Sequence, residues 1–298
     1  MKQLVILSGK GGTGKTTVAA ALAHLASREY PIVLADADVD AANLELVLDP
    51  LMQEERDFAG GQLAVIDSAR CTACGLCAEV CRFDAVITGD EAYRVDALAC
   101  EGCAACYYQY PAEAIHVEEQ RAGQWFRSRT RFGPLFHAHL FAGQENSGKL
   151  VTLVKQQARL LALDTEAALL LVDGPPGIGC PVIAASAGAD LALHVVEPTA
   201  SGAHDLQRIL ATTDHFGVPS LVIVNKADLN LARSEEIAAF CAERGVALAG
   251  HVPYDIVVTE AMVQGLPVTD YTDGPVTEAL EEVWRRIRDS LLIGQRRV

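Results

Sequence analysis

The clearest pattern in this 298-residue chain is a series of short apolar runs without polar interruption, separated by longer segments with helical spacing. The unbroken runs cover residues 4–7, 32–34, 168–172 and 221–224, and a further run at residues 191–196 is interrupted only by His194. An unbroken apolar run predicts a strand that is buried on both faces, as in a sheet covered by helices. The Ala-rich segment that ends near residue 27 and residues 150–163 have the spacing of such helices. The pattern predicts an α/β protein.

The first apolar run leads straight into the glycine-rich segment GKGGTGKTT, which satisfies the phosphate-loop pattern G-x-x-x-x-G-K-[ST]. Backbone N–H groups in such a loop, and the helix that follows, point toward phosphate oxygens. We expect Lys15 to reach the β- and γ-phosphates and Thr16 to place its hydroxyl on Mg²⁺. The residues expected to hold the nucleotide phosphates are Gly9, Lys10, Gly11, Gly12, Thr13, Gly14, Lys15, Thr16 and Thr17. A glycine-rich turn without nucleotide is disfavoured, because a strand, a helix and downstream acidic strand ends are all present.

Carboxylates follow two further predicted strands: Asp36 and Asp38 after residues 32–34, and Asp173 after residues 168–172. The carboxyl ends of parallel strands face the ligand crevice in doubly wound sheets. We therefore expect these carboxylates beside the phosphate loop, with Asp173 holding a water ligand of Mg²⁺. Helix capping is the alternative role for aspartates in this context.

Seven of the nine cysteines lie between residues 71 and 106, and they form a repeat with an offset of 29 residues. The first set is Cys71, Cys74, Cys77 and Cys81, and the second is Cys100, Cys103 and Cys106. This arrangement resembles a bacterial two-cluster ferredoxin, in which the fourth cysteine of each run ligates the other cluster. Zinc is the main alternative, since C-x2-C pairs also build zinc sites, although a third cysteine at the same spacing suits a four-coordinate ion poorly. Disulfides are the weakest alternative for a chain without a signal peptide.

The repeat departs from the ferredoxin pattern at one position, where Tyr110 stands in place of the fourth cysteine of the second set. By the resemblance, Cys81, Cys100, Cys103 and Cys106 form the complete ligand set of a 4Fe-4S cluster. Cys71, Cys74 and Cys77 provide only three thiolates. The resemblance implies a second cluster there, either 3Fe-4S or 4Fe-4S with an open site taken by Tyr110, water or a partner's ligand, while no stable cluster is the least favoured outcome.

Lys10, an extra lysine inside the phosphate loop, resembles the deviant Walker A signature of the MinD, ParA, Mrp and nitrogenase iron protein superfamily. The resemblance implies a doubly wound, mostly parallel P-loop fold and a homodimer, or a heterodimer with a paralogue, in which Lys10 reaches the partner's phosphates. By the same resemblance, Asp38 orients the attacking water and Asp36 supports it. The amide of Gly177 approaches the γ-phosphate.

The same resemblance assigns the reading of adenine to the end of the strand at residues 221–224 and to a later loop. The residues concerned are Asn225, Lys226, Pro253 and Asp255. Asn225 to Asp228 also spell N-K-x-D, the guanine-reading motif of GTPases, so GTP is the alternative to ATP.

We expect a P-loop ATPase in residues 1–59 and 121–298, interrupted by a ferredoxin-like α+β insertion in residues 60–120. The resemblance implies Mg²⁺-dependent ATP hydrolysis coupled to electron transfer or metal-cluster assembly on a partner, which would be a redox or cluster-carrier protein. The alternative is a MinD-like positioning or scaffold ATPase whose ferredoxin domain is structural.

The formal charge of −15 counts against nucleic-acid binding, which relies on Lys and Arg.

No apolar run approaches the ~18 residues of a membrane-spanning helix, so a soluble, cytoplasmic protein without membrane contact is expected. A C-terminal helix from residue 276 carries an apolar stripe that predicts packing on the sheet, with membrane binding as the alternative. Cys180, seven residues after Asp173, is interpreted as a buried structural thiol, and the alternative, by resemblance to the nitrogenase iron protein, is a ligand of a cluster shared across the dimer axis.

Overall fold

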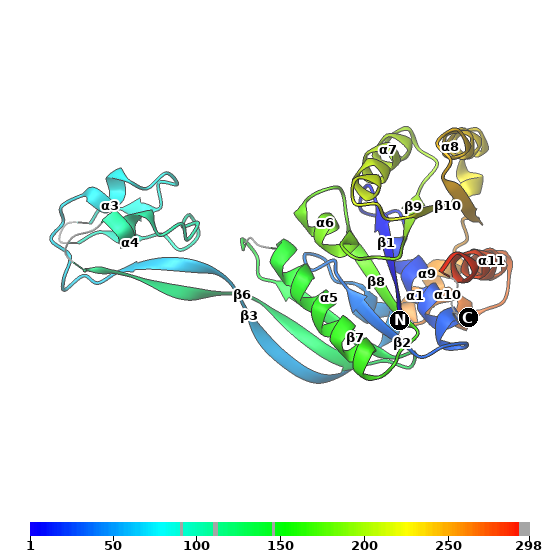
Figure 1. Cartoon of the computed structure of the whole chain (residues 1–298), viewed down its shortest axis with the longest axis horizontal. Coiled ribbons are helices and arrows are strands. Elements are labelled where there is room, and N and C mark those ends of the chain that lie inside the picture. The colour runs from blue at the N-terminus through cyan, green and yellow to red at the C-terminus, as the bar shows by residue number, and fades with distance from the viewer. Residues whose placement is uncertain (90–91, 110–112, 145–146, 292–298) are drawn as a thin grey trace. The chain divides into compact units, whose positions relative to one another are not determined.

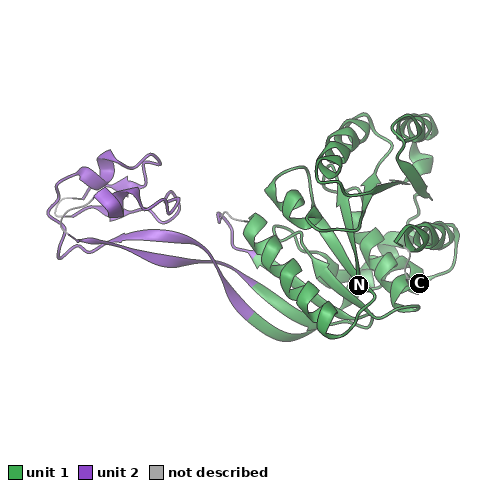
Figure 2. Ribbon diagram, in the orientation of Figure 1, with its two compact units in different colours: residues 1–55, 125–139, 147–298 green, residues 56–124, 140–146 purple. Residues whose placement is uncertain are grey.

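A computed structural model of the chain describes residues 1–89, 92–109, 113–144 and 147–291. These residues divide into two compact units (Figure 2). Unit 1 comprises residues 1–55, 125–139 and 147–298, and unit 2 comprises residues 56–124 and 140–146. The segment 60–120, expected as a ferredoxin-like insertion, falls within unit 2.

The described strands form a nine-stranded sheet in the order β11-β10-β9-β1-β8-β2-β7-β6-β3, and a two-stranded sheet of β4 and β5 (Figure 1). The strands of the large sheet are β1 (Lys2–Ser8), β2 (Ile32–Asp36), β3 (Leu51–Ile66), β6 (Ile115–Arg129), β7 (Pro134–Leu140), β8 (Leu169–Pro176), β9 (Leu191–Val196), β10 (Ser220–Asn225) and β11 (Ala247–Val252). The pairs from β11 through to β7 are parallel. The doubly wound, mostly parallel sheet expected from the sequence is therefore present in unit 1.

Helices cover both faces of the unit 1 sheet, with α1 and α11 on one face and α5 and α6 on the other (Figure 1). The helices of this unit are α1 (Lys15–Ser27), α2 (Leu44–Leu48), α5 (Ser147–Asp164), α6 (Cys180–Ser186), α7 (Ala200–His215), α8 (Leu231–Glu243), α9 (Val257–Val263), α10 (Val268–Tyr271) and α11 (Pro275–Leu291), with a 3-10 turn η1 (Ala227–Leu229). Alternate residues of the central strands, such as Leu4 and Ile6, join one core with α1 and α11. Because both faces are covered, the intervening strand residues are buried as well, which explains the unbroken apolar runs.

The apolar stripe of α11 packs in the core of unit 1, as the sequence predicted. Its members Val276, Leu280, Val283, Ile287 and Leu291 are at most 3% exposed. Across the described residues, every helix is too short or too polar to traverse a bilayer.

Unit 2 contains the cysteine repeat in short elements between the long strands β3 and β6, which both run from one unit into the other. These elements are α3 (Leu76–Glu79), β4 (Val86–Ile87), β5 (Arg94–Val95) and α4 (Ala105–Gln109). A small core of Ala64, Cys77 and Ile115 holds them together. Cys77 is thus part of the buried interior of this unit, and Cys100 and Cys106 pack against it.

Candidate functional site

The phosphate loop connects β1 to α1 and is held against the end of β10. Gly14 has a φ of +86°, and a Cβ there would lie 2.3 Å from Nδ2 of Asn225. That Nδ2 group donates a 2.8 Å hydrogen bond to the carbonyl oxygen of Thr13. Glycine is therefore required at position 14 both for the backbone turn and for the close approach of Asn225.

Lys15 is buried among the acidic strand ends. Its Nζ lies 2.9 Å from Oδ1 of Asp173 and 3.6 Å from Oδ2 of Asp38. Burial disfavours the ammonium form, but Asp173 and Asp38 outweigh that cost and raise the pKa of Lys15. The structure thus brings together the lysine and the carboxylates that the sequence singled out.

Asp173 offers an atom suited to a hydrated cation. Its side chain is fully buried, and its Oδ2 has no hydrogen-bond partner. A buried carboxylate oxygen without a partner is costly unless a ligand or water satisfies it. A Mg²⁺ ion with its water shell would do so, and Thr16 follows Lys15 in the first turn of α1.

Asp36 is fully buried and organises the backbone that follows β2. Its carboxylate accepts hydrogen bonds from the backbone N–H groups of Asp38 (3.0 Å), Asn43 (3.1 Å) and Leu44 (3.0 Å). Burial, followed by the charge of Asp173, raises the pKa of Asp36. Asp36 therefore supports the loop that carries Asp38, and it replaces a side-chain cap at the start of α2.

Replacing Asp36 by Ala is expected to lower the free energy of unfolding by about 2 kcal/mol. Three backbone N–H groups would lose their acceptor, at about 1–3 kcal/mol for each unsatisfied group, and relief of repulsion with Asp173 offsets part of the loss. Urea denaturation without nucleotide measures the effect. Asp40→Ala, which removes an exposed carboxylate from the same loop, is the control and should change the free energy by at most about 0.5 kcal/mol. Equal stability of the two variants would contradict this role.

Lys10 contacts residues of its own chain. Its Nζ lies 3.3 Å from Oε2 of Glu197, and it reaches the hydroxyls of Thr199 and Ser201 at 3.5 and 3.4 Å. Lys226 also pairs with Glu197, at 2.6 Å. Although burial opposes ionisation, Lys226 and Lys10 together lower the pKa of Glu197. Glu197 was not predicted as a site residue, because it lies in a segment without a motif.

One hydrogen bond joins the two segments assigned to base recognition. Oδ1 of Asp228, the last residue of N-K-x-D, accepts a 2.6 Å hydrogen bond from the backbone N–H of Tyr254. Tyr254 stands between Pro253 and Asp255, so the two segments named for nucleotide recognition lie side by side. Asp255 itself accepts a hydrogen bond from the backbone of Val257.

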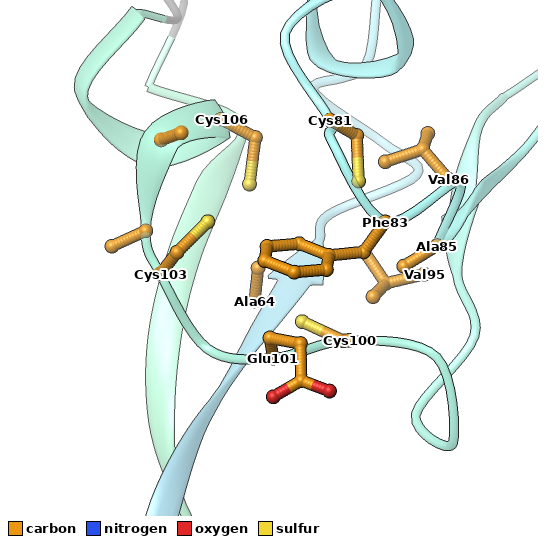
Figure 3. Close-up of a pocket in the computed structure, with 12 residues that line it drawn as sticks. Ala64, Cys81, Phe83, Ala85, Val86, Val95, Cys100, Glu101, Cys103 and Cys106 are labelled. Carbon is orange, nitrogen blue, oxygen red and sulfur yellow. The ribbon is translucent and has the colours of Figure 1, made fainter.

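The complete cysteine set surrounds one pocket in unit 2 (Figure 3). Cys81, Cys100, Cys103 and Cys106 all line it, together with Ala64, Phe83, Ala85, Val86 and Val95. Figure 3 shows the four sulfur atoms around the ring of Phe83. Phe83 is 43% exposed, so a tightly packed core does not hold its ring in place.

The backbone around the cysteines repeats with the same offset of 29 residues as the sequence. Residues with positive φ form three pairs: Ala73 with Gly102, Gly75 with Ala104, and Asp84 with Glu113. A positive φ is uncommon for residues other than glycine. The two cysteine loops therefore share one unusual conformation, which matches a duplicated binding loop better than an unconstrained connection.

The three cysteines of the incomplete set are also close to one another. Burial raises the pKa of Cys77, and nearby Cys71 and Cys74 raise it further. Tyr110, considered as a fourth ligand at this set, lies outside the described residues.

The interpretation of Cys180 as a buried structural thiol is wrong. Cys180 is exposed and is the first residue of α6. Cys241, in contrast, is buried within α8, where it is 1% exposed.

Comparison with known proteins identifies the larger part of the chain. Residues 4–268 match the family described as the CobQ/CobB/MinD/ParA nucleotide binding domain. An uncharacterised protein of Methanocaldococcus jannaschii, MJ0578, is 31% identical over 96% of each chain. A second protein of that organism, the uncharacterised ATP-binding protein MJ0547, is 27% identical over 94% of this chain and 85% of its own length.

Solved structures agree with this fold. The septum site-determining protein MinD from Pyrococcus horikoshii, complexed with Mg-ADP, has a TM-score of 0.59 and 18% identity, and the match covers 96% of this chain and 95% of that one. A MinC:MinD cell division complex from Aquifex aeolicus gives a TM-score of 0.59 at 18% identity over 97% of this chain and 96% of that one. These matches show that the chain has the fold of the family's nucleotide-binding domain.

Proposed function

The chain belongs to the CobQ/CobB/MinD/ParA nucleotide-binding family, and from this premise we propose that it is a dimeric, Mg²⁺-dependent ATPase whose nucleotide state is coupled to an iron-sulfur cluster. The observation that carries the proposal is the convergence of Cys81, Cys100, Cys103 and Cys106 on one pocket. Four cysteine thiolates are the usual ligand set of a 4Fe-4S cluster, which would supply one-electron transfer.

The ATPase part of the proposal rests on the buried group around Lys15. With nucleotide bound, Lys15 would exchange its contacts with Asp173 and Asp38 for phosphate oxygens. Asp173 would then hold a water ligand of Mg²⁺ and Asp38 would orient the attacking water. ATP is preferred to GTP because Lys10 is typical of the deviant Walker A group.

The Gly177 amide is expected to contact the γ-phosphate and Lys10 the dimer partner, but both groups bind residues of their own chain in this structure. This arrangement favours a nucleotide-driven conformational switch. The Gly177 amide donates a 2.9 Å hydrogen bond to the carbonyl of Ser8, and Lys10 pairs with Glu197. Nucleotide binding would replace both contacts. Such an exchange is how a γ-phosphate orders switch segments in other nucleotide-dependent switches.

The chain order supports coupling between the nucleotide and the cysteines. Asp36 and Asp38 are followed by α2 and then by β3, which runs into unit 2. The output would be electron transfer or cluster assembly on a redox or cluster-carrier protein. The active dimer is a homodimer or a heterodimer with a paralogue, and the relatives of this chain in M. jannaschii include MJ0578 and MJ0579, which are 31% and 25% identical to it.

The second candidate is a positioning or scaffold ATPase in which the cysteine-rich unit is structural. The similarity to MinD structures favours it. It requires nucleotide binding and dimerisation, but no dependence of either on the oxidation state of a cluster.

Measuring ATP hydrolysis by anaerobically purified protein, first oxidised and then reduced with dithionite, distinguishes the candidates. We expect the turnover rate to change at least about threefold on reduction, and to return when the protein is reoxidised. A family member without cysteine sets controls for effects of dithionite. Equal rates in both states, together with ATP-dependent binding to a scaffold surface such as liposomes, would favour the second candidate.

A further inference from the structure

A group of potential metal ligands lies in unit 1, separate from the cysteines and from the phosphate loop. His137 and His139 are two residues apart on β7, so their side chains leave the same face of the strand. Glu45 lies in the first turn of α2. One ligand atom from each of the three residues lies within 4.8 Å of the other two.

The distances are close to those of a metal site. Nδ1 of His137 is 2.9 Å from Oε2 of Glu45, and Nε2 of His139 is 3.3 Å from Oε1 of the same carboxylate. Ligand atoms about 2.0–2.1 Å from a tetrahedral zinc ion are about 3.3 Å from one another. Small side-chain rotations would therefore bring the three groups into a zinc coordination shell.

The environment of His137 argues against a simple ion pair. Its side chain is 4% exposed, yet Nδ1 has no hydrogen bond of acceptable geometry, despite its closeness to Glu45. A buried ring nitrogen without a hydrogen bond is costly, and a metal ion would satisfy it. The carboxylate lies beside the nitrogen but is not aligned for a hydrogen bond, as expected where both groups face a third partner.

Neighbouring residues fix the orientation of the two imidazole rings. The Ser128 hydroxyl lies 3.0 Å from Nε2 of His137, the nitrogen that faces away from Glu45. The ring of Phe126 stacks on His137 at a centroid distance of 5.1 Å and meets His139 edge-on at 5.4 Å. A hydrogen bond to the second ring nitrogen is the usual means by which a protein orients a histidine ligand.

We propose that Glu45, His137 and His139 form a binding site for a divalent transition metal ion of the zinc class. Two imidazoles and one carboxylate favour such an ion over Mg²⁺ or Ca²⁺, which prefer oxygen ligands. Three protein ligands leave a fourth position for water, as in zinc sites of the His2Glu type.

The site adjoins the segment that Asp36 organises. The backbone N–H groups of Asn43 and Leu44 bind Asp36, and Glu45 is the next residue. A metal ion bound to Glu45 would therefore tie the first turn of α2 to β7, and zinc should stabilise unit 1 independently of nucleotide and of any iron-sulfur cluster.

Zinc titration of the full-length protein, with cluster iron in place and monitored by calorimetry, tests the site. We expect the wild-type protein to bind one zinc ion per chain at this site, and His139→Ala and Glu45→Gln to weaken that binding at least about tenfold. His139 is 43% exposed, so its removal leaves the core intact, and circular dichroism checks the fold of each variant. His215→Ala, which removes an exposed histidine of α7, is the matched control and should bind as the wild type does.

Cobalt separates this site from the cysteines, which also bind soft metals. Co²⁺ bound by nitrogen and oxygen ligands gives visible ligand-field bands without the thiolate charge-transfer bands of a cysteine site. We expect the titration of wild-type protein to yield such bands and both variants to lose them. The proposal would be overturned if His139→Ala and Glu45→Gln bound zinc as tightly as the wild type does. It would also be overturned if these substitutions left the cobalt bands unchanged.

Discussion

Lys15→Ala is expected to abolish nucleotide binding and to lower ATP turnover by a factor of at least about 10²–10³, the usual cost of removing one charged group that stabilises a transition state. The ammonium of Lys15 lies among Asp173, Asp38 and Asp36, so it is the group that neutralises the carboxylates where phosphates would enter. Without it, triphosphate would meet uncompensated negative charge. Binding of a fluorescent ATP analogue and steady-state hydrolysis measure the two effects.

The same substitution should also destabilise the protein without nucleotide. Asp173 is fully buried, and removing the partner of a buried carboxylate costs about 3–5 kcal/mol. Loss of hydrolysis is therefore assigned to the site only if circular dichroism at the assay temperature shows a folded protein. Wild-type hydrolysis by a folded Lys15→Ala protein would contradict the proposed ATPase mechanism.

Lys10→Ala is the matched control, because it removes a second lysine from the same loop. The Lys10 side chain is 33% exposed and its ion pair with Glu197 lies near the surface, so little stability should be lost. This variant should still bind the nucleotide analogue, but it should fail to dimerise with ATP in light-scattering measurements. If Lys10→Ala formed as much dimer with ATP as the wild type does, Lys10 would not contact the partner's nucleotide.

The sequence predicted the elements whose burial is uniform and whose motifs are local. Five strands of the large sheet are buried on both faces: β1, β2, β8, β9 and β10. A strand buried in this way needs apolar residues at successive positions, so its sequence is an apolar run. The phosphate loop and the cysteine repeat could also be predicted, because the residues that form each motif are close together in the sequence. The geometry of such segments follows from the order of residues along the chain.

The long strands β3 and β6 could not be predicted in the same way. Most residues of β3 are exposed or only partly buried, and its first half contains the polar run Gln53 to Asp57, so neither an apolar run nor regular alternation marks it. Pairing with a strand that begins more than fifty residues later supplies its hydrogen bonds, and single-sequence patterns do not contain that information.

Other site residues could not be predicted because their partners are far away in the sequence. Glu197 pairs with Lys10, and Glu45 meets His137 and His139, only because the sheet brings their elements together. Cys180 was interpreted as buried because free cysteines usually are, but it is exposed at the start of α6. Burial at a helix end depends on what packs beyond it.

Cys103→Ser is expected to remove one whole cluster, about four iron atoms per chain. Cys103 lines the four-cysteine pocket and is exposed, so its sulfur contributes little to the packing of unit 2. The loss should appear in iron analysis and in the EPR spectrum of dithionite-reduced protein. The dependence of ATP turnover on reduction should disappear with it, because the proposed coupling requires this cluster.

Two other exposed cysteines make the test specific. Cys180→Ser removes an exposed thiol outside both sets and should leave the iron content at the wild-type value. Cys74→Ser should remove the iron of the three-cysteine set and retain that of Cys81, Cys100, Cys103 and Cys106. If Cys103→Ser kept all its iron, Cys103 would not be a cluster ligand. If Cys74→Ser emptied both sets, the two sets would not hold separate clusters.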